Sequence, residues 1–508
     1  MQAFFGNLGL VAPLAAPGAA GTTSYVLASW LFLRLLGLIY FAAFVSLATQ
    51  IKGLVGSQGV LPVAEFLASR RGWGVHRFYR VPTLCWWNGS DGFLGLLSWG
   101  GALLSLLLVV GIAPMLMLTL LWVVYLSLFN VGRIFLAYQW DILLLETGFL
   151  AIFLAPAKIL PDFPPAAAPP TLIRWLLWWL LFRLMFSSGF VKFRSGDEAW
   201  RRLTALRHHH QTQPLPTPLA WYAHQLPLRL HKLTAALLFL IELFVPFLIV
   251  APPPLRHIAA VLFIVLMLLI HFTGNYCFFN LLGIALSVML LDDKLLEPAF
   301  RFIIRGVQVP MTAPPGYQDW IAVPIALLIL MLSVPTICRL IRIDLNWPGP
   351  LHALFELFEP FRLVNSYGLF SVMTTERPEI IVEGSHDGMT WQSYEFKWKP
   401  CDVQRAPQFV APHQPRLDWQ MWFAALGYYP DHPWFRRFLL RLLEGSPSVL
   451  SLLRHNPFAD APPRFVRGVL YDYQFTNRAQ RRAMGAWWRR ERRGVYSPIL
   501  ELKDFEKQ

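Results

Sequence analysis

Charge is scarce in this sequence. Only 15% of its 508 residues are charged, against 56% that are hydrophobic, whereas soluble proteins carry roughly 25% charged residues. Cysteine is scarce too, and four residues in a chain of this length exclude a scaffold held together by disulfides. With a mean hydropathy of +0.46, these shortages exclude an ordinary soluble enzyme and indicate a protein that crosses a membrane several times.

Recognisable catalytic motifs are absent as well. The sequence has no Gly-x-Ser-x-Gly, no Walker loop, no Gly-x-Gly-x-x-Gly, no His-Glu-x-x-His and no Cys-x-x-Cys. The best metal candidate is the histidine run 208–210 with His224 and His231, but no carboxylate or Cys lies at ligand spacing. His413 and Asp418 lack a nucleophile to activate. We therefore expect no metal, no cofactor and no catalytic residue, and we interpret the histidine run as a polar loop beside the membrane.

Long apolar runs are what the sequence does have. The first covers about residues 25–48, and others lie near 93–111, 115–130, 141–155, 172–190, 233–251, 257–272, 276–291 and 320–338. A helix of about 20 residues crosses a ~30 Å hydrocarbon core. Several runs are shorter than this, so we predict six to nine spans, with 257–291 forming either one broken helix or two.

The composition changes near residue 340, after which charged residues are frequent and no span-length run returns. Residues 377–384 and 391–398 predict two strands joined by an Asp-Gly turn, and 417–426 and 434–443 predict helices. The predicted fold is an α-helical multispan membrane bundle followed by a small α+β soluble C-terminal domain, with strands first and helices after. We place the domains at 1–340 and 341–508.

The net charge of +14 is concentrated in basic loops and in an arginine-rich end. The loops 49–92 and 191–232 are separated by an even number of spans, so we expect them on one side, and the positive-inside rule favours the cytoplasm. Seven arginines surround Trp487 and Trp488 within 478–493. In a membrane protein these features favour contact with lipid head groups, through an interfacial helix, over nucleic-acid binding.

Several ionisable residues fall inside the apolar runs. A lone charge at the bilayer centre costs roughly 2.5–3.5 kcal/mol on insertion scales, so these side chains are expected to face the protein interior. They form either structural ion pairs, for which we favour Arg183 with Glu242 and Arg34 with Glu146, or a polar cavity that binds a ligand. The predicted intramembrane polar cluster comprises Arg34, Asn130, Arg133, Asp141, Glu146, Arg183 and Glu242.

Five ordered stretches of the chain carry a resemblance to a known family. They contain RLLGLIY at 34–40, YLSLFNVG at 125–132 with LETGFL at 145–150, HQTQPLP at 210–216 with IELFVP at 241–246, VNSYGLF at 364–370, and HNPF at 455–458. In this order they are similar to the lipase maturation factor family over about residues 30–500. The chain departs from the family pattern at Asp141, where Glu is usual, and at Cys401, where Gly is usual.

The resemblance implies a multipass membrane factor that helps secreted lipases fold and assemble, without a catalysed reaction of its own. It implies that the C-terminal domain contacts the client and faces the lumen of the endoplasmic reticulum in eukaryotes, whereas a bacterial chain would lie in the inner membrane. The expected partners are membrane lipids and a secreted lipase-like client, not nucleic acid. The candidate client-binding residues are Arg377, Glu379, Glu383, Trp391, Trp398, Arg416, Asp418 and Trp419.

A second hypothesis comes from a different class of protein. The membrane half is similar in architecture to the vitamin K-dependent carboxylase type of transmembrane domain, although no residue motif carries its catalytic groups. This alternative is an integral-membrane enzyme acting on a lipid or quinone-like substrate. It predicts a ligand beside Arg133, Asp141 and Glu146.

Overall fold

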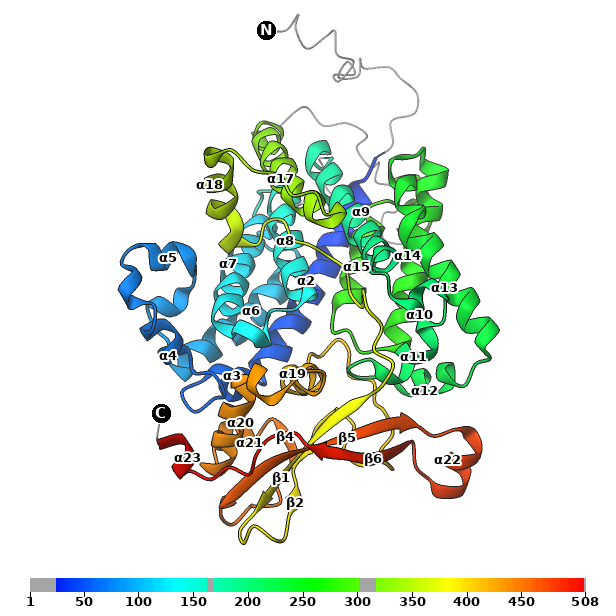
Figure 1. The fold of residues 1–508 in the computed structure, drawn as a ribbon. Helices are drawn as coiled ribbons and strands as arrows, with labels where there is room; N and C mark the ends of the chain where they lie inside the picture. The colour runs from blue at the N-terminus through cyan, green and yellow to red at the C-terminus, as the bar shows by residue number, and fades with distance from the viewer. Residues whose placement is uncertain (1–23, 162–167, 301–316, 507–508) are drawn as a thin grey trace, which may run out of the picture.

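The computed structural model describes residues 24–161, 168–300 and 317–506. A bundle of helices forms one half of the molecule, and a domain built on an antiparallel sheet lies at one end of it (Figure 1). This confirms the predicted fold class, a helical membrane bundle followed by a C-terminal domain with strands and helices.

Seven helices in the described ranges are long and apolar enough to cross a membrane. They are α2 (Val26–Ala48), α6 (Asp91–Val110), α7 (Pro114–Gly132) with η4 (Arg133–Phe135), α9 (Thr171–Arg194), α13 (Leu228–Leu243) with η5 (Val245–Val250), α14 (Pro253–Thr273) and α17 (Tyr317–Ile341). Two further apolar runs form shorter helices, α8 (Gln139–Leu154) and α15 (Phe279–Val288). The stretch 257–291 therefore forms two helices, and the helical structure is interrupted at 274–278 between α14 and α15.

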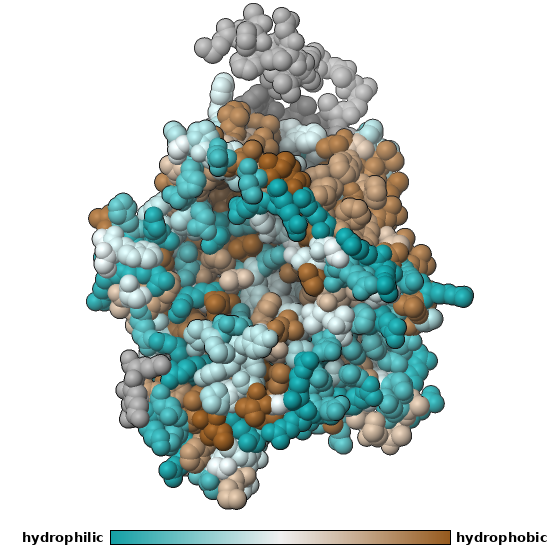
Figure 2. All heavy atoms as spheres, in the orientation of Figure 1, coloured by the Kyte–Doolittle hydropathy of each residue, from teal (hydrophilic) through white to brown (hydrophobic). Residues whose placement is uncertain are grey.

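Exposed apolar side chains cover one flank of the bundle. Hydrophobic residues gather on the upper half of the molecule, over the region of α13, α14 and α17, whereas hydrophilic residues dominate the lower half (Figure 2). Leu237 on α13 and Leu269 on α14 are 47% and 56% exposed. A soluble protein rarely exposes so much contiguous apolar surface, so this flank faces lipid.

The C-terminal domain has a four-stranded antiparallel sheet in the order β2-β1-β5-β6. Its strands are β2 (Gln392–Ser393), β1 (Pro378–Ser385), β5 (Phe465–Phe475) and β6 (Trp488–Val495). Two more strands, β3 (Glu395–Phe396) and β4 (Leu453–His455), pair beside it. The helices α19 (Arg416–Ala425), α20 (Pro433–Leu443) and α21 (Pro447–Leu450) are inserted between β3 and β4.

Two expectations for this domain are wrong. The strands do not all precede the helices, because β5 and β6 follow α20 and complete the sheet around β1. The arginine-rich end is not one interfacial helix, because only α22 (Arg478–Met484) is helical and 488–495 is strand β6. In β6 the charged side chains lie along a sheet edge, where charge discourages pairing with other chains.

The structure confirms the prediction that the two basic loops lie on the same side of the membrane. In loop 49–92, Gln58 O accepts a hydrogen bond from Ser446 of the C-terminal domain at 2.8 Å. In loop 191–232, Gln225 Nε2 donates to Thr476 O of the same domain at 3.3 Å. Because both loops touch the C-terminal domain, a cytoplasmic position for the loops and a lumenal position for that domain cannot both hold.

Candidate functional site: a polar junction between bundle and C-terminal domain

After α18 (Gly349–Phe358) and the short helix η6 (Glu359–Phe361), residues 362–377 run without regular structure along the bundle to β1 (Figure 1). We call these residues the crossing segment. Asn365 lies beside Arg183, at the middle of α9, and Gly368 lies against Val191, near the end of α9. Backbone without helix or strand is tolerated at membrane depth only where protein groups satisfy its hydrogen bonds.

Glu146 on α8 supplies those hydrogen bonds. Its Oε2 accepts from the backbone N and the side-chain Nδ2 of Asn365, both at 3.0 Å, and from the hydroxyl of Tyr367 at 2.7 Å. Its other oxygen pairs with Arg183, which also donates to Asn365 O at 3.2 Å. The carboxylate therefore fixes the crossing segment in the bundle.

Asp141, at the start of α8, holds the C-terminal domain directly. Arg416 of α19 donates to its two oxygens at 2.8 and 2.9 Å, and Tyr125 donates to Oδ1 at 2.5 Å. Arg416 and Asp141 are both fully buried. Burial opposes the charge of the guanidinium, but the adjacent carboxylate raises the pKa of Arg416 above its ordinary value. This bidentate pair is the geometry in which a buried ion pair is most strongly held.

Helix α19 carries further groups into the bundle. Gln420 donates to Ile134 O and to the hydroxyl of Tyr138, and Trp422 donates to Thr212 O at 2.8 Å. Trp419 packs edge-on against Trp140 with ring centroids 4.8 Å apart. Because almost every side chain of α19 is buried between the sheet and the bundle, this helix is the principal docking element of the C-terminal domain.

A third buried charge group lies under the sheet. Glu379 on β1 lies 2.7 Å from Arg377 and 3.0 Å from Lys399. Burial favours the neutral amine, but neighbouring Cys401 and Glu379 raise the pKa of Lys399. Arg377 also donates to the backbone oxygens of Gln211, at 2.7 Å, and Pro214, at 2.8 Å. The end of the crossing segment is thereby tied to loop 191–232.

The predicted pairings of intramembrane charges are wrong. Arg183 pairs with Glu146, and Glu242 pairs instead with Lys192, whose Nζ lies 2.7 Å from Oε2. Arg34 donates to Leu108 O at 3.3 Å and lies over the ring of Trp30 at 5.1 Å. The expectation that Glu146 and Glu242 lie in the interior is correct. The sequence alone does not show which of several basic residues pairs with each acid.

The remaining members of the predicted polar cluster lie apart. Asn130 donates to Pro82 O and Leu126 O, at 3.0 and 2.9 Å. Arg133 lies over the ring of Phe66 at 5.2 Å. The seven residues therefore do not form one cavity, and the side chains of Asp141 and Glu146 are occupied by protein partners.

The predicted client-binding residues divide by exposure. Arg377, Glu379, Arg416, Asp418 and Trp419 are 2% exposed or less. Of the others, Glu383 pairs with Arg467 at 2.8 Å, Trp391 lies under the same guanidinium, and Trp398 is partly buried. Client binding by these residues stays a prediction, and for the five buried ones a direct contact would require the junction to open.

Sequence reasoning missed the polar side chains that receive the C-terminal domain. Asn275, in the break between α14 and α15, accepts from the backbone N of Val410 at 2.7 Å and donates to Gln408 O at 2.8 Å. Gln50 donates to Gln414 O at 2.8 Å and accepts from Arg416 N at 2.9 Å. A polar residue interrupting a long apolar run was the available signal for Asn275.

The histidine run forms a helix rather than a loop. Helix α11 (Ala205–Thr212) contains His209, whose Nε2 lies 3.0 Å from the hydroxyl of Tyr276. Among the residues that the structure describes, no group of three or more His, Cys, Asp or Glu has a geometry that could hold a metal ion. Burial, with a smaller contribution from Lys192, lowers the pKa of His209 to about 4.

Acidification is therefore expected to lower the stability of the protein. The folded-state pKa of His209 lies below its ordinary value of 6.5, so only the unfolded chain binds a proton between these values. Stability is complete above about pH 6.5 and falls as the pH decreases toward 4. Thermal unfolding in detergent at several pH values measures this, and His209→Gln should reduce the slope; an unchanged slope would contradict the prediction.

Gly368 is expected to resist substitution. Its φ is +149°, and a Cβ atom there would lie 2.6 Å from Val191 of α9. Gly368→Ala should cost about 1–3 kcal/mol, because two hydrogen bonds between Gly368 and Gln139 hold the crossing segment against the helix. The control is Gly349→Ala, where nothing lies within 4 Å and the change should stay within about 0.5 kcal/mol. Equal unfolding midpoints for the two variants would refute the packing argument.

The fold and the junction together define a multispan membrane protein whose C-terminal domain is held against the helical bundle by buried ion pairs and hydrogen bonds. Two family profiles match it in sequence: the lipase maturation factor transmembrane domain over residues 27–298, and the lipase maturation factor C-terminal domain over residues 363–498. The chain belongs to the lipase maturation factor family.

Curated relatives are similar to this chain over most of its length and most of their own. Lipase maturation factor 2 of Gallus gallus is 37% identical, covering 93% of this chain and 81% of the relative. Lipase maturation factor 2 of Homo sapiens is 37% identical over 93% of this chain and 82% of its own length. Lipase maturation factor 1 of Mus musculus is 34% identical, covering 97% and 91%. No solved structure matches the chain.

Proposed function

We propose that this protein is a membrane-embedded factor that assists the folding and assembly of secreted lipases, with the C-terminal domain on the side where the client folds. The observation that carries the proposal is the match with relatives named lipase maturation factors along more than nine-tenths of the chain. In a eukaryotic cell the site of action is the endoplasmic reticulum membrane, and in a bacterium it is the inner membrane.

The surface of the C-terminal domain offers a place for a client. Strand β6 lies at the edge of the sheet, and Val495 at its end is 62% exposed. Tyr428 is 80% exposed and Leu426 43%; their loop adjoins the end of β6, because Tyr496 donates to Ala424 O at 2.8 Å. A half-assembled client exposes apolar surface and strand edges until its own interface forms, and this edge has both.

Cells lacking their own lipase maturation factor provide the test. Expression of this chain with a secreted dimeric lipase should restore active lipase in the medium, measured against an unrelated secreted protein as control. Tyr428→Asp combined with Val495→Asp should lower secreted activity at least tenfold, because a hot-spot loss of about 2 kcal/mol weakens binding about 30-fold. Met389→Asp, at a residue 87% exposed in the turn between β1 and β2 at the other edge of the sheet, should have no effect.

Two results would reject the proposal. One is full lipase secretion without the chain, and the other is equal rescue by an unrelated membrane protein. Orientation is tested separately by Gly388→Asn, which creates the acceptor sequence Asn-Met-Thr in a turn where φ is already +76°. An endoglycosidase-sensitive mass shift is expected in a eukaryotic host, and its absence would contradict the lumenal position.

A further inference from the structure

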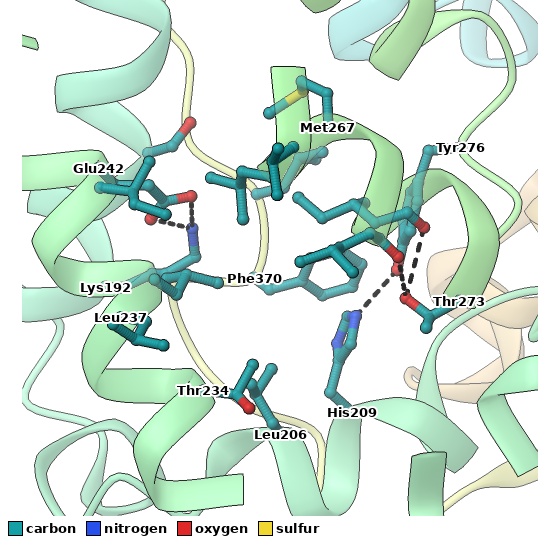
Figure 3. Close-up of a pocket in the computed structure, with 18 of the residues that line it drawn as sticks. Lys192, Leu206, His209, Thr234, Leu237, Glu242, Met267, Thr273, Tyr276 and Phe370 are labelled. Carbon is teal, nitrogen blue, oxygen red and sulfur yellow. Dashed lines mark hydrogen bonds and ion pairs between the residues drawn. The ribbon is translucent and has the colours of Figure 1, made fainter. Parts of the chain in front are cut away.

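A cavity of about 550 Å³ lies in the bundle (Figure 3), and the junction charges Asp141 and Glu146 are not among its lining residues. Helices α9, α11, α13 and α14 form its walls, and Phe370 of the crossing segment projects into it. The walls are mostly aliphatic. Leu237 on α13 and Leu269 on α14 line the cavity and are also about half exposed on the lipid-facing flank. The cavity is therefore reached sideways, between α13 and α14, from the hydrocarbon of the membrane.

The cavity extends along the axis of α13. His231 lies in the first turn of the span Leu228–Val250, and Glu242, near the middle of the span, lines the other end. Eleven residues of helix separate them, a rise of about 16 Å. One end thus lies at the depth of lipid head groups and the other near the centre of the bilayer, which is the arrangement of an amphipathic lipid.

The head-group end holds two imidazoles, each with one buried ring nitrogen that has no hydrogen-bond partner among the described residues. His231 is 3% exposed, and its Nε2 makes no hydrogen bond; Nδ1 of His210 on α11 is likewise buried and unbonded. Their ring centroids are 5.7 Å apart, and both line the cavity. Buried polar atoms in native proteins almost always have a partner, and a group that exchanges hydrogen bonds with both rings would satisfy this end of the cavity.

The charge of the site favours an uncharged head. Burial holds the pKa of His210 well below its ordinary value, so its ring is neutral at pH 7. Lys192 lines the cavity, but both oxygens of Glu242 accept from it, at 2.7 and 2.8 Å. The exposed basic residues nearby, Arg207, Arg229 and Lys232, do not line the cavity. A phosphate would find no free cation among the lining residues, whereas a hydroxyl group could donate to one imidazole and accept from the other.

We propose that this cavity binds one membrane lipid with an uncharged hydroxyl-bearing head, whose head contacts His210 and His231 and whose chain lies between α13 and α14. The site is separate from the client surface at Tyr428 and Val495. If the lipid-binding test below fails, the proposed role in lipase maturation is unaffected. If the lipase secretion test fails, the proposed lipid site is likewise unaffected.

The test uses the full chain in phosphatidylcholine vesicles with three photoreactive probes of equal chain length. One is a monoacylglycerol, one a lysophosphatidic acid and one a plain hydrocarbon, each carrying a diazirine in its chain. The monoacylglycerol should label lining residues of α13 and α14, identified by peptide mass spectrometry, and it should label them more strongly than the lysophosphatidic acid.

Matched variants locate the site. Thr234→Trp fills the cavity from an exposed lining position and should reduce labelling at least tenfold, whereas Ala236→Trp, exposed on the same helix but outside the cavity, should change it less than twofold. The double variant His210→Phe with His231→Phe should weaken labelling by the monoacylglycerol about fivefold or more. Labelling by the hydrocarbon probe should not change, because only the lipid head loses hydrogen bonds.

Three outcomes would overturn the proposal. They are equal labelling of Thr234→Trp and Ala236→Trp, label spread evenly over the lipid-facing helices, and stronger labelling by the lysophosphatidic acid. Thr234→Trp leaves every buried residue in place, so it tests occupancy even where the double histidine variant unfolds. Unfolding midpoints in the same detergent confirm that each variant compared is folded.

Discussion

Arg416→Met is expected to destabilise the docked protein by about 3–5 kcal/mol, the range found when one partner of a buried ion pair is removed. The variant leaves Asp141 fully buried with only Tyr125 as side-chain partner, and it removes the hydrogen bonds of the guanidinium between α19 and the bundle. The unfolding midpoint in detergent and the yield of folded membrane protein measure the loss.

A second substitution tests whether the loss comes from the uncompensated charge. Asp141→Asn combined with Arg416→Met leaves no charge at the site and keeps an acceptor for Tyr125, so it should recover more than half of the lost stability. The control is Arg437→Met, which breaks an ion pair with Glu65 in which both side chains are about half exposed and should cost less than about 1 kcal/mol. A double variant no more stable than Arg416→Met would rule out the charge as the cause.

Glu146→Leu is expected to release the crossing segment. It leaves Arg183 buried without a counter-ion and removes the acceptor for Asn365 and Tyr367, so a loss of at least about 3–5 kcal/mol follows. Glu146→Gln keeps an acceptor and should lose less. Limited trypsin digestion, which can cut after Arg362 and so separate the C-terminal domain, measures the release together with the unfolding midpoint.

The control for Glu146 is another acid in a salt bridge. Glu198→Leu removes the partner of Arg202, where both side chains are more than 70% exposed, and a pair of this kind contributes about 0–1 kcal/mol. If Glu146→Leu digests no faster than Glu198→Leu, the crossing segment is held by something other than this carboxylate.

The sequence predicted well what depends on local composition. Nine apolar runs became helices, and α19 and α20 begin and end within a residue or two of their expected limits. Asp141 and Glu146 are buried, as expected for ionisable residues within the runs, whereas Arg133 is exposed. The interior position of the two acids was predictable because the cost of exposing either to hydrocarbon does not depend on which partner it finds.

The sequence did not predict what depends on distant pairing. Asp141 meets Arg416 and Glu146 meets Asn365 across more than 200 residues, and no periodicity connects positions so far apart. Strand β6 was missed for a different reason. As an edge strand it has little apolar alternation, and its arginines are equally compatible with a surface helix.

The crossing segment and Arg416 are synthesised after the helices of the bundle, and this affects the state of the bundle during synthesis. Every helix that surrounds Asp141 is made before Arg416, the residue that neutralises this acid, whereas Glu146 meets its counter-ion Arg183 within the bundle. The bundle therefore waits in the membrane with Asp141 uncompensated until the last third of the chain emerges, and a product ending near residue 345 keeps that acid without its counter-ion. Such a truncation loses the client surface and the buried partner of Asp141 together, so it does not separate loss of a client surface from loss of the fold. Only point variants on the outer face of the C-terminal domain can make that distinction.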